Sequence, residues 1–241
     1  RLAIKRGEHG LDVGCGTGDT SLELADAVGP EGSVTGIDVS RPMLQKATAR
    51  ASTIPELNLS FIEADAQTHD LPAGRFDFLF SRFGVMFFGD PVAAFANLRS
   101  AARPGGRIGF VCWRDPADNP WATLPARVAR AHVELPPRPP ANAPGQFGFA
   151  DEAYVRQVLE TAGWADIAVE RFDTRIALGR DTTEAADFLI EMGPAGPALA
   201  EAGAETRRRA HADLRAALED HAGPGGVRMD YSTWIVTARI S

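Results

Sequence analysis

The sequence lacks most of the features that mark secreted, membrane-spanning and metal-binding proteins. It contains two cysteines, Cys15 and Cys112, each inside a predicted core element, and this predicts reduced thiols and a cytoplasmic setting. No apolar run approaches the ~20 residues that cross a bilayer, and residues 1–10 show no secretory signal. The five histidines are scattered, and no Cys/His cluster has metal-ligand spacing. We therefore expect no membrane span and no metal site.

Positive charge is also scarce. The net charge is -7 and the isoelectric point is near 5.3, whereas a protein that binds a polyanion usually carries a basic stripe. The densest basic cluster, Arg207 to Arg209, stands among acidic residues on a predicted helix, and a solvated helix face explains it. We therefore expect no nucleic-acid partner.

The sequence does contain a series of alternating strand and helix patterns. Short apolar runs alternate with segments of helical spacing, and several of these end in glycine or proline turns. Such alternation predicts parallel β-α-β units with right-handed crossovers, hence helices on both faces of a sheet. The expected strands are 9–13, 33–38, 57–64, 76–81, 107–113, 167–172 and 231–240, and the expected helices are 19–28, 41–51, 91–101, 151–162 and 182–221.

These elements predict one α/β domain over residues 1–241, with a Rossmann-like, seven-stranded, mostly parallel sheet. We expect the strand order 3-2-1-4-5-7-6, with the last strand, 231–240, antiparallel. The cofactor-binding core is expected at 9–113. The proline-rich stretch 114–150 predicts an irregular loop beside the substrate, and 173–228 predicts a helical lid insertion over the carboxyl ends of the strands.

The strongest local signal is a glycine-rich turn between the first strand and its helix, which reads Leu11-Asp12-Val13-Gly14-Cys15-Gly16-Thr17-Gly18. Glycines let the backbone turn sharply and approach a ligand, and the helix start adds free N–H groups. The dinucleotide fingerprint is G-x-G-x-x-G, but here Asp19 occupies the place of its third glycine. A carboxylate there disfavours a pyrophosphate. A purely structural turn is the alternative reading.

The second signal is Asp38, at the end of the second expected strand. An acidic side chain at this place can accept hydrogen bonds from both hydroxyls of an adenosine ribose. Alone it does not separate a nicotinamide cofactor from S-adenosylmethionine. An acidic residue that merely precedes a helix N-terminus is the competing interpretation.

Five segments in order resemble the class I S-adenosylmethionine methyltransferases, most of all the branch with the ubiquinone/menaquinone-biosynthesis C-methyltransferases and many small-molecule methyltransferases. The resemblance covers residues 9 to about 113, and residues 114–230 resemble nothing that assigns a substrate. The segments are Asp12 to Gly18, Gly36-Ile37-Asp38, Glu63-Ala64-Asp65-Ala66, Phe76-Asp77-Phe78-Leu79-Phe80 and Arg103-Pro104-Gly105-Gly106.

The resemblance implies S-adenosylmethionine as the cofactor and assigns a role to each matching position. Carboxylates accept from N–H and O–H donors, and a thioether packs on a flat ring, so the roles are chemically sensible. Alternatively, Met43 is a residue of the hydrophobic core, as methionines on helices often are. The implied roles are Asp12 near the ammonium group, Gly14, Gly16 and Gly18 along the amino-acid portion and ribose, Asp38 on the ribose, Met43 over the adenine, Asp65 and the N–H of Ala66 on the adenine edge, and Ser81 near the methionine moiety.

The sequence does not identify a catalytic base. Methyl transfer from a sulfonium is an in-line displacement, so positioning the nucleophile and excluding water matter most. The candidates His69, Arg82 and Trp113 follow expected strand ends, although His69 also reads as a surface histidine. Ser81-Arg82-Phe83-Gly84 stands where amino-methyltransferases of nucleic-acid bases carry an (Asn/Asp)-Pro-Pro-(Tyr/Phe) box and where metal-dependent catechol-type enzymes carry acidic ligands. The sequence therefore disfavours both nucleic-acid base methylation and metal-dependent O-methylation.

We therefore expect an enzyme that methylates a small, partly apolar organic acceptor held under a lid. The acceptor, the attacked atom and the oligomeric state are not assigned by the sequence. The alternatives are a nicotinamide-dependent oxidoreductase and a non-catalytic S-adenosylmethionine-binding protein. Because relatives usually carry helices before the first strand, either a further N-terminal segment precedes this sequence or the site is more open than usual, and we expect the former. The aromatic residues expected to line the acceptor pocket are Phe83, Phe87, Trp113, Trp121, Phe147 and Phe149, although they also read as core.

Overall fold

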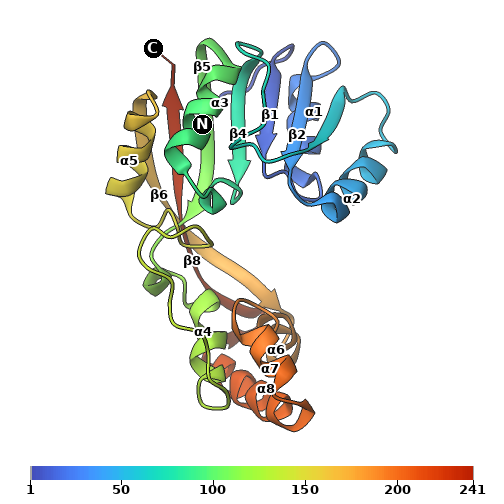
Figure 1. Ribbon diagram of the computed structural model, residues 1–241. Coiled ribbons are helices and arrows are strands. Elements are labelled where there is room, and N and C mark those ends of the chain that lie inside the picture. The colour runs from blue at the N-terminus through green and yellow to red at the C-terminus, as the bar shows by residue number, and fades with distance from the viewer. Residues whose placement is uncertain (1, 241) are drawn as a thin grey trace. The chain divides into compact units, whose positions relative to one another are not determined.

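The computed structural model describes residues 2–240 and divides into two compact units (Figure 1). Unit 1 takes in the described residues up to Trp113, then Asn142–Arg171, and the chain from Trp234 onward. Unit 2 consists of Arg114–Ala141 and Phe172–Thr233. The predicted core over 9–113 falls within unit 1.

The strands form a mixed sheet whose order is β3-β2-β1-β4-β5-β8-β6. This is the predicted order, since β8 is the seventh strand expected from the sequence, and the fold class is confirmed. The pairs β1–β2, β1–β4, β2–β3 and β4–β5 are parallel. The strands are β1 His9–Val13, β2 Ser33–Asp38, β3 Leu59–Glu63, β4 Phe76–Arg82, β5 Ala102–Trp113, β6 Ala165–Gly179, β7 Ala222–Gly223 and β8 Gly226–Arg239.

Strand β8 runs antiparallel to β5, as predicted. The N–H of Ile240 donates to the carbonyl of Gly106 over 2.9 Å, and the N–H of Arg114 donates to the carbonyl of Ser232 over 3.2 Å. The end of β8 thus pairs with the start of β5, and the end of β5 pairs with the earlier part of β8. Figure 1 shows the arrow of β8 pointing opposite to that of β4.

The helices of unit 1 cover both faces of its sheet. Right-handed crossovers toward β3 and toward β5 leave in opposite directions from β1 and β4, so their helices lie on opposite faces. On one face Leu24 of α1 packs with Val34 and Phe78, and on the other Phe95 of α3 packs on Phe110, with ring centroids 5.5 Å apart. These helices are α1 Asp19–Val28, α2 Arg41–Ala51, α3 Pro91–Ala101 and α5 Glu152–Thr161, with the short 3-10 helix η1 Val85–Phe87.

Unit 2 is built mainly from helices. Leu124, Leu189, Leu199 and Leu214 are buried on four of its helices and give the unit an apolar core. The fully buried side chain of Asn119 accepts from the N–H of Ser232 and donates to its carbonyl, both over 2.9 Å. The elements are η2 Pro116–Asp118, α4 Pro120–Ala129, α6 Thr182–Leu189, α7 Ala195–Glu201, α8 Ala204–Leu218 and η3 Glu219–His221.

Three sequence predictions need correction. The sheet has eight strands, because the short β7 forms a hairpin with β8. Residues 114–150 are not wholly irregular, since Pro120 stands in the first turn of α4, where a missing N–H costs nothing. The expected insertion 173–228 has strand at both ends, because β6 continues to Gly179 and β8 begins at Gly226.

A buried ion pair ties the start of the chain to the sheet. Arg107 of β5 donates to both carboxylate oxygens of Glu8, over 2.7 and 3.0 Å, and to the carbonyls of Leu2 and Ala3. Burial alone would raise the pKa of Glu8, but the hydrogen bonds and positive charge of Arg107 outweigh it and lower that pKa. The stabilisation from Glu8 is therefore present above its ordinary pKa and is lost as the pH falls through the folded value.

We predict that Arg107→Met lowers the free energy of unfolding at pH 7 by about 3 kcal/mol, because it leaves the Glu8 carboxylate buried without its partner. Urea denaturation followed by circular dichroism measures this. Arg180→Ala is the matched control, since Arg180 pairs with Glu184 while its side chain is 91% exposed. The control should keep the wild-type midpoint. A wild-type midpoint for Arg107→Met would show that the ion pair does not hold the fold.

Candidate functional site

The glycine-rich turn after β1 adopts the conformation that its glycines allow. Gly14, Gly16 and Gly18 have φ values of 67°, 54° and 80°, in the left-handed region that side chains rarely enter. The N–H groups of Gly14 and Cys15 donate to the carbonyl of Ile37 at the end of β2, over 2.9 and 3.2 Å. The turn is thus fixed against the neighbouring strand.

The turn is also in backbone contact with the loop that follows β4. A Cβ on Gly14 would lie 2.7 Å from the Cα of Gly84, and a Cβ on Gly84 would lie 2.9 Å from the Cα of Gly14. The buried hydroxyl of Ser81 donates to the carbonyl of Val13 over 2.7 Å and accepts from the N–H of Gly84. Ser81 therefore connects the two loops, a contact that no local pattern in the sequence indicates.

Asp12 is a fully buried carboxylate at the end of β1. Its Oδ2 accepts from the hydroxyls of Thr20 and Ser21, over 2.9 and 2.6 Å, while Oδ1 has no partner among the described residues. Burial raises the pKa of Asp12 to about 6, against hydrogen bonds from Ser21 and Thr20 that lower it. A buried acceptor without a partner costs free energy unless a donor reaches it. The predicted ammonium-binding residue thus has an oxygen in need of a donor.

Asp38 ends β2 beside the same turn. Its Oδ2 accepts from the N–H of Gly16 and its Oδ1 accepts from the N–H of Ser40, both over 2.8 Å. Each carboxylate oxygen can accept a further hydrogen bond. The side chain therefore orients the glycine turn and retains capacity for a ligand's hydroxyls.

Asp19 opens α1 and keeps its negative charge. A hydrogen bond from Arg50 over 2.6 Å and one from Thr17 over 2.9 Å lower the pKa of Asp19. Arg50 also donates to the carbonyl of Thr17. An ionised carboxylate therefore stands at the start of α1, at the position of the dinucleotide fingerprint's third glycine.

The expected adenine side of the site lies at the ends of β2 and β3. Met43 is 47% exposed, and a Cβ on Gly16 would lie 3.8 Å from its sulfur. Its side chain therefore lies beside the glycine turn and does not belong to the buried core. Val39, which the sequence did not single out, is 69% exposed next to Asp38. Large apolar side chains left open beside a polar turn are suited to a flat ligand ring.

Asp65 and Ala66 follow β3 in an ordered segment. The exposed Asp65 accepts from the N–H of Gln67 over 2.9 Å, and Ala66 is buried. Asn97 of α3 donates to the carbonyls of Ala66 and His69, over 3.0 and 2.9 Å. Asn97 is thus a positioning residue that sequence reasoning missed, because nothing in the spacing links it to Ala66.

The three catalytic candidates stand in different surroundings. Arg82 is exposed at the end of β4, and its charge opposes the burial that raises the pKa of Asp12. Trp113 is buried, with its ring stacked on Phe83 at a centroid distance of 4.3 Å. His69 is partly exposed and its backbone is held by Asp65 and Asn97. Only the imidazole of His69 is chemically a base, because an indole has no basic nitrogen and a guanidinium is already protonated.

Two aromatics that were expected to line the acceptor pocket are core residues instead. Phe149 is buried and packs with Phe95, Phe110 and Tyr154 in unit 1. Trp121 is buried in unit 2, where its indole N–H donates to Asn119. Phe87, by contrast, is 59% exposed. The alternative interpretation, that these aromatics belong to the core, is therefore correct for Phe149 and Trp121.

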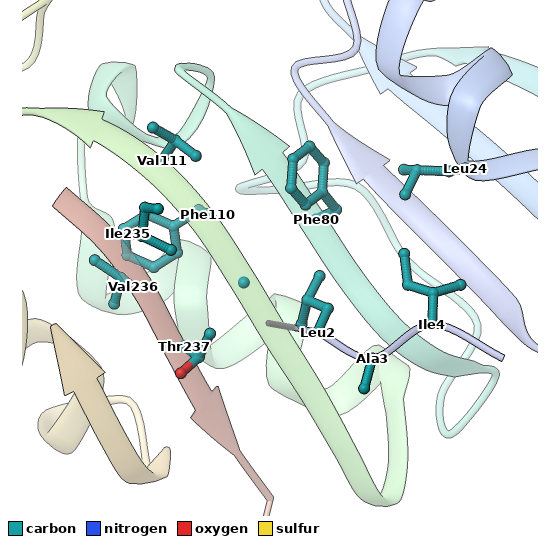
Figure 2. A pocket seen from close by; sticks show the side chains of 11 residues that line it. Leu2, Ala3, Ile4, Leu24, Phe80, Phe110, Val111, Ile235, Val236 and Thr237 are labelled. Atoms are coloured by element: carbon teal, nitrogen blue, oxygen red, sulfur yellow. The ribbon is translucent and has the colours of Figure 1, made fainter. Parts of the chain in front are cut away.

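A separate apolar hollow of about 490 Å³ lies on the sheet of unit 1 (Figure 2). Phe80, Val111 and Ile235 point into it from neighbouring strands, and Leu24 borders it from α1. None of the glycine-turn residues lines it. The hollow is therefore distinct from the candidate site.

Both cysteines are buried, and Cys15 belongs to the glycine turn itself. Cys15 and Cys112 are free and buried, and burial raises the pKa of Cys15 to about 12. Over residues 2–240, no group of three or more His, Cys, Asp or Glu side chains is arranged to hold a metal ion. No helix in the same span is both long and apolar enough to cross a membrane.

Comparison with known sequences connects this geometry to a family. Residues 11–106 match the family model described as a methyltransferase domain. An aklanonic acid methyltransferase of Streptomyces is 38% identical over 104 residues, which cover 43% of this chain and 47% of that protein. A demethylmenaquinone methyltransferase of Geobacillus is 32% identical over 108 residues, which cover 45% of this chain and 46% of that protein. The chain thus aligns with about half the length of these curated relatives.

Solved structures share the fold over nearly the whole chain. The YcgJ protein from Bacillus subtilis has a TM-score of 0.65 at 14% identity, covering 99% of this chain and 94% of that chain. A SAM-dependent methyltransferase from Aquifex aeolicus has a TM-score of 0.56 at 19% identity, covering 100% of this chain and 86% of that one. Residues 11–106 are therefore similar to a methyltransferase domain, and the chain shares its fold with a solved SAM-dependent methyltransferase.

Proposed function

We propose that the protein transfers a methyl group from S-adenosylmethionine to a small, partly apolar organic acceptor. The observation that carries the proposal is the buried Asp12, whose Oδ1 has no partner among the described residues, directly before the glycine turn pressed on Gly84. A ligand with an ammonium group and an uncharged ribose fits this acceptor and this turn. A pyrophosphate does not, because Asp19 stays ionised.

The cofactor would be held by groups that the fold has already fixed. Asp12 would receive the ammonium group, and Asp38 would receive the ribose hydroxyls while it keeps the N–H of Gly16 in place. Met43 and Val39 would cover the adenine, and Asp65 with the N–H of Ala66 would meet its edge. Gly14, Gly16 and Gly18 would let the ligand approach the backbone, and Ser81 would keep the turn against the β4 loop.

When bound, S-adenosylmethionine supplies an electrophilic methyl group on a sulfonium, so no further activation of the leaving group is required. The protein then has to place the acceptor atom in line and keep water out. Arg82 is exposed beside the turn. If the acceptor loses a proton and becomes an anion, the positive charge of Arg82 can hold it in place. His69 is the candidate base, whereas Trp113, whose indole has no basic nitrogen, is a candidate for positioning the acceptor.

The acceptors in the relatives' names are organic molecules, aklanonic acid and demethylmenaquinone. They support a small organic acceptor here, and the lid formed by 114–150 and 173–228 remains a prediction. The net charge of -7 supports the absence of a nucleic-acid partner, and the two free thiols support a cytoplasmic location.

We predict that Asp38→Ala weakens binding of S-adenosylhomocysteine at least tenfold, because two hydrogen bonds to a carboxylate contribute about 1.5–3 kcal/mol each. Asp65→Ala should weaken it less, since the N–H of Ala66 still meets the adenine. Isothermal titration calorimetry measures both affinities. Wild-type affinity in a folded Asp38→Ala variant would remove Asp38 from the site, and circular dichroism checks the fold.

We predict that affinity for S-adenosylhomocysteine is nearly constant above pH 7 and falls as the pH drops through 6. The reason is that protonation removes the charge of Asp12, whose pKa is about 6, and between pH 7 and pH 5 the loss should be about tenfold. Calorimetry from pH 5 to 8 measures the profile, and Asp12→Asn should bind weakly with a flat profile. A flat wild-type profile would contradict a role for Asp12.

The same group predicts an opposite effect on stability. Because the pKa of folded Asp12 lies above the ordinary 3.8, its contribution to stability is present below that value and is lost as the pH rises through 6. The charged form then costs on the order of 3 kcal/mol at pH 8. Asp12→Asn should therefore unfold in urea at no lower concentration than wild type at pH 8, although it binds the ligand poorly. A marked loss of stability would show that Asp12 acts through the fold.

A further inference from the structure

Phe83 has a strained backbone at the carboxyl end of the sheet. Its φ is 65°, in the left-handed region that residues other than glycine seldom adopt. The N–H of Phe83 donates to the carbonyl of Val111 over 3.0 Å, which holds this conformation against β5. Residues held in such a conformation gather at functional sites, where the surrounding structure offsets the strain. In this conformation the Phe83 ring lies on the ring of Trp113.

The two rings form a fixed flat surface. Phe83 and Trp113 are stacked with centroids 4.3 Å apart and planes 7° from parallel. Trp113 is only 7% exposed, and its main-chain N–H donates to the sulfur of Met86 over 3.5 Å, so its backbone is held in unit 1 and its ring is buried. Phe83 is partly exposed and makes no second ring contact among residues 2–240. One face of its ring is thus covered by Trp113, and the residue remains accessible to solvent.

The surface lies next to the candidate cofactor turn. Phe83 directly precedes Gly84, whose backbone touches Gly14, and the hydroxyl of Ser81 ties the same loop to Val13. A flat molecule on Phe83 would therefore lie beside the turn that we assign to the methionine end of the cofactor. Stacked rings of this kind attract another conjugated plane more than a saturated ring of equal size.

We propose that Phe83 is the specificity-determining platform for the acceptor and that it selects a planar, conjugated ring over a saturated one. The proposal rests on the proposed function for the place of the methyl donor. Trp113 is a positioning residue in this arrangement, because it sets the plane of Phe83. The alternative is that Phe83 only shields Trp113 from water.

The test uses two matched probes, 2-naphthol and its saturated counterpart decahydro-2-naphthol, which share the ring skeleton and the hydroxyl group. Each is titrated into the full chain saturated with S-adenosylhomocysteine, and binding is followed by calorimetry. We expect the planar probe to bind the wild type at least about fivefold more tightly than the saturated one.

The variants separate the flat face from the apolar bulk. Phe83→Leu keeps an apolar side chain and the same backbone demand but removes the ring, so the preference should fall to within about twofold. Phe83→Tyr keeps the ring and should keep the preference. Phe172→Leu is the matched control outside this loop, since Phe172 is 44% exposed and has no assigned role in the site, and it should also keep the preference.

Three results would overturn the proposal. They are equal affinities of the two probes for the wild type, no binding of either probe at millimolar concentration, and an unchanged preference in Phe83→Leu. Affinity for S-adenosylhomocysteine should stay within about twofold of wild type in all three variants. If S-adenosylhomocysteine fails to bind the wild type, the proposed function fails, and this result is distinct from a lost ring preference.

Discussion

The candidate site depends on the contact between two backbones, Gly14 after β1 and Gly84 after β4. Neither position has room for a Cβ, and the Ser81 hydroxyl bonds to both sides of the contact. Adjacent parallel strands bring their carboxyl ends to one edge of a sheet, and here the crossovers leave in opposite directions from that point. The glycine turn, Asp38 and the loop with Arg82 and Phe83 take their places from this contact.

A second constraint is electrostatic. Asp12 lies under the turn with no exposed surface, so its charge destabilises the folded protein at neutral pH unless a cationic ligand compensates it. Arg82 opposes the effect from the surface. Burying a carboxylate with one unpartnered oxygen is a cost that folding alone does not explain. A ligand that brings a donor to Oδ1 accounts for it, and this links the stability of the domain to its function.

The β-α units and the glycine turn were predictable because they follow from local rules. Apolar runs separated by helical spacing give β-α units, and glycines before a helix give a tight turn. Contacts between distant segments left no local pattern. The bonds of Asn97 to Ala66 and His69, the contact of Gly14 with Gly84 and the core place of Phe149 depend on packing that no spacing encodes. For the same reason α4 was missed, since its prolines read as loop until Pro120 is seen in a first turn.

We propose that the glycine turn with Asp12 and Asp38 forms an S-adenosylmethionine site and not a dinucleotide site. The most direct measurement is calorimetric titration of the wild-type chain with S-adenosylhomocysteine and, separately, with NADH. We predict that S-adenosylhomocysteine binding saturates at one molecule per chain and that NADH gives only its heat of dilution. Saturable binding of NADH with no binding of S-adenosylhomocysteine would contradict it.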